Sequence, residues 1–87
     1  MNEMYIVSFN STHHAIRTEK ILNENNITCT TLPTPREITA SCGISIRFLL
    51  EDLDTVKNLL VSSEVDYKGI FKIQKLSDGK KSVEQIG

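Results

Sequence analysis

The chain has 87 residues, which is enough for one small domain and too few for a deep enclosed cavity. Hydrophobic residues make up 39% and charged residues 24% of the sequence, a balance that excludes a disordered chain and a membrane-embedded one. Ten basic and eleven acidic side chains leave a formal net charge of -1, so no bulk positive field attracts nucleic acid or anionic lipid. Residues 1–4 carry no secretory signal, and we expect a cytoplasmic protein with no nucleic-acid partner and no membrane partner.

The first two predicted elements are a strand and a helix. Residues 5–9 alternate between two faces and are mostly aromatic or β-branched, which predicts a strand. Ser11 follows as a helix-capping residue, and the stretch up to Asn25 contains no Gly or Pro, which predicts a helix. Ile16 points away from the apolar face of this helix, so we expect it at the surface or against another subunit.

The next two predicted elements are strands. Residues 27–33 are rich in β-branched side chains and end at Pro33, which cannot donate to a ladder. Residues 44–48 alternate more clearly, with three apolar side chains on one face. Ser45 and Arg47 fall on the other face of that strand, which we expect to be partly solvated.

The remaining pattern predicts a helix at about 51–60 and a fourth strand at 69–73. The order strand, helix, strand, strand, helix, strand predicts an α+β, ferredoxin-like βαββαβ fold, with a four-stranded antiparallel sheet and two helices on one face. We expect a single ferredoxin-like domain over 1–75 and a mobile C-terminal tail over 76–87, or a short helix there docked on a partner. In this fold the first two strands are parallel, which places residues 10–14 near residues 33–43.

Residues 34–37 form a capping-box pattern that predicts a short helical turn. The Thr34 hydroxyl would accept from the Glu37 N–H, while the Glu37 carboxylate reaches back to the Thr34 N–H. Pro35 stands at the first helical position, where its missing N–H costs nothing. We expect the turn to continue through residues 38–41.

Cys42 is the candidate functional residue, because it is followed by Gly43 at the start of the third strand, where glycine permits close approach of another group. Arg36 and the N–H groups at the start of the first helix would favour its thiolate, although the end of the short helix would oppose this. The candidate binding residues at the helix start are Ser11, Thr12 and His13. A buried Cys42 that acts only as a small hydrophobe is the alternative.

Cys29 is expected to be structural, because it lies within the second strand. A hairpin that pairs Pro33 with Gly43 separates Cys29 from Cys42 by roughly 13 Å, which predicts no disulfide. The cysteine spacing fits no zinc motif, and adjacent helical side chains such as those of His13-His14 point about 100° apart, so they cannot chelate together. We therefore expect no metal and no cofactor.

The chain resembles a small bacterial family described as selenium/sulfur carrier-like, formerly a domain of unknown function. The likeness rests on Pro35-Arg36-Glu37-Ile38 followed by Ser41-Cys42-Gly43-Ile44 and spans about residues 4 to 73. The resemblance implies that Cys42 holds sulfur or selenium as a persulfide or selenenyl sulfide. It also implies donor and acceptor proteins as partners, and a carrier or accessory protein rather than a stand-alone enzyme.

A second hypothesis stays open beside the carrier. The domain would then be a non-catalytic dimerising or regulatory module that uses its sheet edge or the Ile16 face, with a second copy of the chain as its partner. In that case the turn at 35–37 would be a ligand or partner contact. The exposure and reactivity of Cys42 distinguish the two hypotheses.

Overall fold

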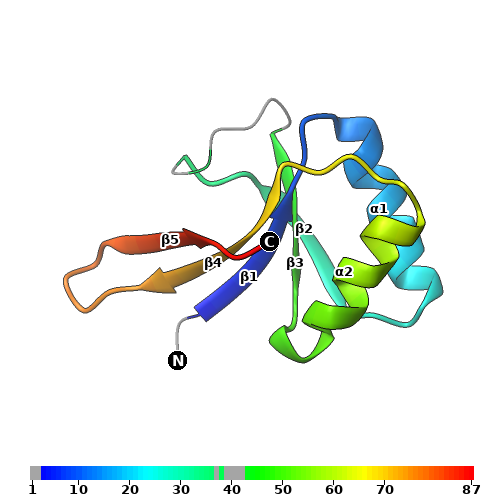
Figure 1. Ribbon diagram of the computed structural model, residues 1–87. Helices are drawn as coiled ribbons and strands as arrows, with labels where there is room; N and C mark the ends of the chain where they lie inside the picture. Colours follow the sequence, from blue (N-terminus) through cyan, green and yellow to red (C-terminus); the bar gives the residue numbers. More distant parts are fainter. Residues whose placement is uncertain (1–2, 37, 39–42) are drawn as a thin grey trace.

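The computed structural model describes residues 3–36, 38 and 43–87. The elements are β1 (Glu3–Ser8), α1 (Thr12–Glu24), β2 (Cys29–Pro33), β3 (Ile44–Phe48), α2 (Leu53–Ser62), β4 (Gly69–Lys75) and β5 (Lys81–Gln85), with a 3-10 turn at Leu50–Asp52. The strands form one antiparallel sheet in the order β2-β3-β1-β4-β5 (Figure 1). Because β1 and β2 both run antiparallel to β3, they point in the same direction, as the sequence predicts.

Local sequence explains where α1 begins and ends. The side chain of Ser11 accepts a hydrogen bond from the His13 N–H at 3.2 Å and so caps the first turn. Asn26 ends the helix in the left-handed region, with a φ of 59°, which asparagine tolerates better than most residues. The chain then passes directly into β2.

One face of the sheet is covered by both helices, which lie on the same side of it (Figure 1). The buried apolar cluster between them draws on β1, β3, β4, α1 and α2, and this confirms the predicted α+β class with two helices against an antiparallel sheet. Its most buried large members are Val7, Phe9, Leu22, Ile46, Val56, Leu60 and Ile70.

The opposite face of the sheet has a second, smaller apolar cluster. Ile38, from the connection between β2 and β3, is only 6% exposed and packs with Ile6, Phe71 and Ile73. Arg47 lies on this face and is exposed, so the face is partly solvated, as the sequence predicts, although Ser45 on the same face is fully buried. The burial of Ser45 is possible because its hydroxyl is hydrogen-bonded to other hydroxyl groups, which lowers the cost of removing it from water.

The sheet has five strands, and the prediction of four is therefore wrong. Lys81–Gln85, which the sequence assigns to the tail, pairs with β4 through a turn at Gly79, whose φ is 86°. Val83 lies directly opposite Ile73, so the hairpin extends the smaller apolar cluster outward. Within the described part of the chain, no helix has the length and apolar character needed to cross a membrane.

Candidate functional site

Cys42, Glu37 and residues 39–41 lie outside the described residues, and Gly43 is the described residue that follows Cys42 in the chain. Gly43 is exposed immediately before β3, and a Cβ added to it would meet no atom of the described residues within 4 Å. The described residues therefore leave the space beside Gly43 open to another group.

A backbone hydrogen bond closes the base of the connection that contains Cys42. The Thr34 N–H donates to the Gly43 carbonyl oxygen at 2.9 Å and extends the β2–β3 pairing by one step. Pro33 lies opposite Ile44, so the predicted pairing of Pro33 with Gly43 is wrong by one residue. Thr34 and Gly43, which flank the segment 35–42, are thus held side by side.

Three hydroxyl groups connect this base to the centre of the sheet. The Thr34 Oγ1 and Ser45 Oγ atoms share a hydrogen bond of 2.8 Å, and Ser45 Oγ shares another of 2.9 Å with Ser8 Oγ. Ser8 and Ser45 are fully buried. The chain of hydroxyls therefore ties the start of the connection to β3 and β1. The sequence pattern does not reveal it, because serine in a strand is usually solvent-facing.

Part of the turn predicted for residues 34–41 lies within the described residues. The Ile38 N–H donates to the Pro35 carbonyl oxygen at 3.0 Å, which closes one turn around Arg36. The Thr34 N–H of the predicted capping box is already bonded to Gly43. The other half of that box involves Glu37, which lies outside the described residues.

Arg36 lies on the sheet face that the helices leave uncovered. It is exposed and lines a hollow of about 430 Å³, whose other described lining residues are Met4, Leu32, Pro33, Thr34, Pro35 and Lys81. The helices pack against the other face. The structure therefore does not bring Arg36 together with the residues at the start of α1.

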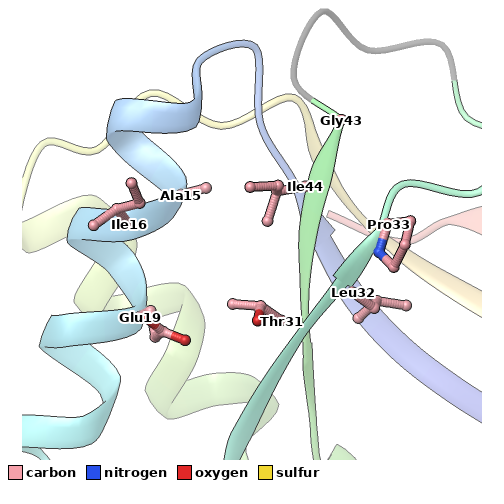
Figure 2. A pocket seen from close by; sticks show the side chains of 8 residues that line it. All are labelled: Ala15, Ile16, Glu19, Thr31, Leu32, Pro33, Gly43 and Ile44. Carbon is pink, nitrogen blue, oxygen red and sulfur yellow. The ribbon is translucent and has the colours of Figure 1, made fainter.

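A groove runs between α1 and the end of the β2–β3 hairpin (Figure 2). It has a volume of about 420 Å³ and is lined by Ala15, Ile16, Glu19, Thr31, Leu32, Pro33, Gly43 and Ile44. The side chain of Ile16 is 60% exposed there, as the sequence predicts. The groove lies between α1 and the residues Pro33 and Gly43, and Gly43 is the residue that follows Cys42 in the chain.

The candidate binding residues at the start of α1 have other surroundings. Ser11 caps the helix, and Thr12 and His13 are exposed. None of the three lines the groove in the described part of the chain. The rings of His13 and His14 meet edge to face at 5.9 Å, and His14 Nδ1 accepts a hydrogen bond from the Asp66 N–H at 3.4 Å.

The described residues contain no group of three or more side chains that could hold a metal ion. Cys29 is half-buried at the first position of β2, where its Sγ donates to Asn23 Oδ1 at 3.6 Å. Burial raises the pKa of the Cys29 thiol, and the nearby Glu19 carboxylate raises it further. The thiolate form of Cys29 is therefore disfavoured, which makes Cys29 a poor nucleophile.

A comparison with family models matches residues 4–72 to the family described as "Putative Se/S carrier protein-like". The match covers most of the chain, and the chain belongs to this family. No curated protein and no solved structure matches it.

Proposed function

We propose that this protein carries sulfur or selenium on Cys42 and delivers the atom to a partner protein. Membership of the Se/S carrier-like family is the observation that carries the proposal. The sequence has two cysteines, and the half-buried Cys29 thiol, whose pKa is raised, is poorly suited to nucleophilic attack. This leaves Cys42 as the carrier thiol.

The loading step is a thiol exchange that needs no external oxidant. The Cys42 thiolate attacks the outer sulfur of a donor persulfide, a bond forms between the two sulfurs, and the S–S bond of the donor breaks. The donor cysteine leaves as a thiolate and takes up a proton, while Cys42 becomes a persulfide. A donor selenenyl sulfide would load selenium in the same way.

The delivery step reverses this chemistry. An acceptor thiolate attacks the outer atom on Cys42, and Cys42 leaves as a thiolate ready for another cycle. Both steps require a free thiol, and we therefore place the protein in a reducing compartment such as the cytoplasm. The partner proteins are the donor and the acceptor.

The groove beside Gly43 supports an approach of the partner along α1. Its wall residues Ile16, Pro33 and Ile44 are apolar (Figure 2), and Ile16 is largely exposed. A partner that approaches Cys42, the residue before Gly43, would pass over this surface. The backbone hydrogen bond between Thr34 and Gly43 would keep these two residues in place during that contact.

We also infer that β1 to β4 with both helices form a ferredoxin-like arrangement. The order β2-β3-β1-β4, with every neighbouring pair antiparallel, supports this. In this arrangement β5 is an addition outside β4. β5 lies at the opposite edge of the sheet from β2, so it leaves the pairing of β2 with β3 next to Gly43 unchanged.

The test of the carrier function is the intact mass of the protein after incubation with a small-molecule persulfide and removal of the excess. Wild type and Cys29→Ser are expected to gain one sulfur atom, and Cys42→Ser is expected to gain none. Addition of an acceptor thiol should then return the mass of the loaded protein to its starting value. Loading of Cys42→Ser equal to that of wild type would refute the carrier function.

The second candidate is a dimerising interaction module, and the exposed Ile16 at an open sheet edge favours it. β2 is the edge strand beside Ile16 and carries no charged side chain to discourage pairing. Light scattering would then show a dimer in wild type and a monomer in Ile16→Asp. Val61→Asp is the matched control, because Val61 is 69% exposed on α2. A monomeric wild type would remove this candidate.

A further inference from the structure

The hollow under Arg36 combines an apolar floor with two cations. Met4, Leu32 and the two prolines line its apolar part, while Arg36 and Lys81 supply the charge. Met4 and Leu32 also pack against the smaller apolar cluster, so the floor belongs to the folded core of this face. A volume of about 430 Å³ is within the range of small-molecule sites.

The two cations have no acidic partner among the described residues. Glu3 is the residue before Met4 in the chain. Its carboxylate, however, accepts a hydrogen bond from the Tyr5 hydroxyl at 2.8 Å and lies 3.9 Å from Lys72 Nζ. Successive residues of a strand point to opposite faces, which directs Glu3 away from the hollow. The described lining of the hollow contains no carboxylate at all.

A third cation reinforces this imbalance. Lys75 on β4 lies directly opposite Lys81 on β5, and both side chains are on the same face as Ile73. Like charges placed directly opposite each other in a sheet are destabilising. The chain as a whole has a net charge of -1, so this concentration of positive charge is local and is not a consequence of composition.

We propose that this hollow binds a small molecule that carries a doubly charged oxyanion, such as a phosphate monoester, on an apolar body. The planar guanidinium of Arg36 suits two oxygens of such a group, and Lys81 adds a second positive charge. Met4, Leu32 and the prolines contact the apolar body. The bound anion relieves the repulsion between Lys75 and Lys81.

The probe is phenyl phosphate, titrated into the labelled full-length protein at low salt and followed by amide chemical shifts. Saturable shifts are expected at Met4, Thr34 and Lys81. Arg36→Gln and Lys81→Gln are each expected to weaken the affinity about tenfold, because each removes a charge-assisted contact. Preserved shift dispersion in each variant shows that its fold is intact.

Lys20→Gln is the matched control, because Lys20 is exposed on α1 across the sheet and its loss changes the net charge equally. Its affinity for phenyl phosphate should equal that of wild type. Equal weakening in Lys20→Gln, or an absence of saturable binding, would overturn the site. Binding of phenol as tight as that of phenyl phosphate would overturn the role of the cations, and equal affinity for inorganic phosphate would overturn the role of the apolar floor.

The proposal for the hollow does not rest on the proposed carrier function. The described residues that line the hollow belong to β1, β2, the segment 34–36 and β5. Cys42→Ser should therefore bind phenyl phosphate as wild type does, while it fails to load sulfur. The two proposals can thus fail separately, and loss of phenyl phosphate binding in Cys42→Ser would count against the independent site.

Discussion

The two faces of the sheet are covered in different ways. Two amphipathic helices bury one face, and their apolar side chains form one cluster with those of β1, β3 and β4. On the other face, Ile38 from the connection between β2 and β3 packs against Ile6, Phe71 and Ile73. The helix-covered face therefore holds the larger apolar cluster, and the opposite face holds the smaller one.

The largest contrast is expected between Leu22 and Ile38. Leu22→Ala removes a fully buried side chain under a helix and should lower the free energy of unfolding by about 2–5 kcal/mol. Ile38→Ala should lower it by less, about 1–2 kcal/mol, because Ile38 belongs to the smaller apolar cluster and Leu22 to the larger one. Chemical denaturation measures both values.

Amide exchange is the second measurement for this pair. Ile38→Ala should speed exchange at Thr34 and Ile38 while leaving the amides of α1 unchanged. Equal losses of stability in the two variants, with uniform changes in exchange, would show that both faces unfold as one unit.

The next expected effect concerns the buried hydroxyls. Ser45→Ala leaves Ser8 buried without a partner and should cost about 1–3 kcal/mol in the free energy of unfolding. The double variant Ser8→Ala with Ser45→Ala should cost less than the sum of the single variants, since it leaves no orphaned hydroxyl at Ser8. Strict additivity in this double-mutant cycle would contradict a shared hydrogen bond.

The next expected effect is a difference in alkylation rate between Cys29 in β2 and Cys42 in the segment between β2 and β3. Cys29 has a raised thiol pKa, so alkylation of Cys29 at pH 7 should be slow and should accelerate as the pH rises through that pKa. Glu19→Gln removes a negative charge and should lower the pKa of Cys29, which speeds its reaction at neutral pH. Cys42 should react faster than Cys29 in the same protein. Peptide mapping of the labelled sites measures both rates, and slower labelling of Cys42 would oppose the carrier function.

The smallest expected effect is a gain in stability at the β4–β5 hairpin. Lys75→Glu replaces a like-charge pair with an opposite-charge pair across from Lys81 and should raise the free energy of unfolding by about 0.2–1 kcal/mol. The same variant should weaken phenyl phosphate binding, because it neutralises positive charge beside the hollow. Thermal denaturation at low and high salt checks the sign, and the gain should shrink at high salt. Destabilisation by Lys75→Glu would show that Lys75 has a favourable contact.

The helix-covered face could be predicted from sequence, because its signals are regular. Alternation in residues 44–48 and helical spacing in α1 and α2 identify elements whose bounds shift by only a few residues in the structure. β5 could not be predicted, since Val83 is its only apolar residue and its neighbours are polar. Its strand conformation comes from pairing with β4, which is a tertiary effect.

The candidate site was predictable only in its chemistry. The sequence singles out Cys42 and Arg36 as residue types that suit sulfur transfer and anion contact. It does not reveal that the chain turns at Pro35 toward the face without helices, which separates Arg36 from α1. Lys81 joins the hollow from a strand that the sequence pattern hides, and Ser45 is buried by partners on distant segments.

The central place of β1 has a consequence for how the chain folds. Val7 pairs with Ile46 on one side and with Ile70 on the other, so the first strand has no neighbour in the sheet until distant segments arrive. Contacts of such high sequence separation slow folding, because the entropy of closing the intervening loops is lost before the strands gain from pairing. During synthesis, the apolar β1 stays without its partners until β3 and β4 have left the ribosome. Cooperative refolding in the range of about milliseconds to seconds is the behaviour that this topology favours.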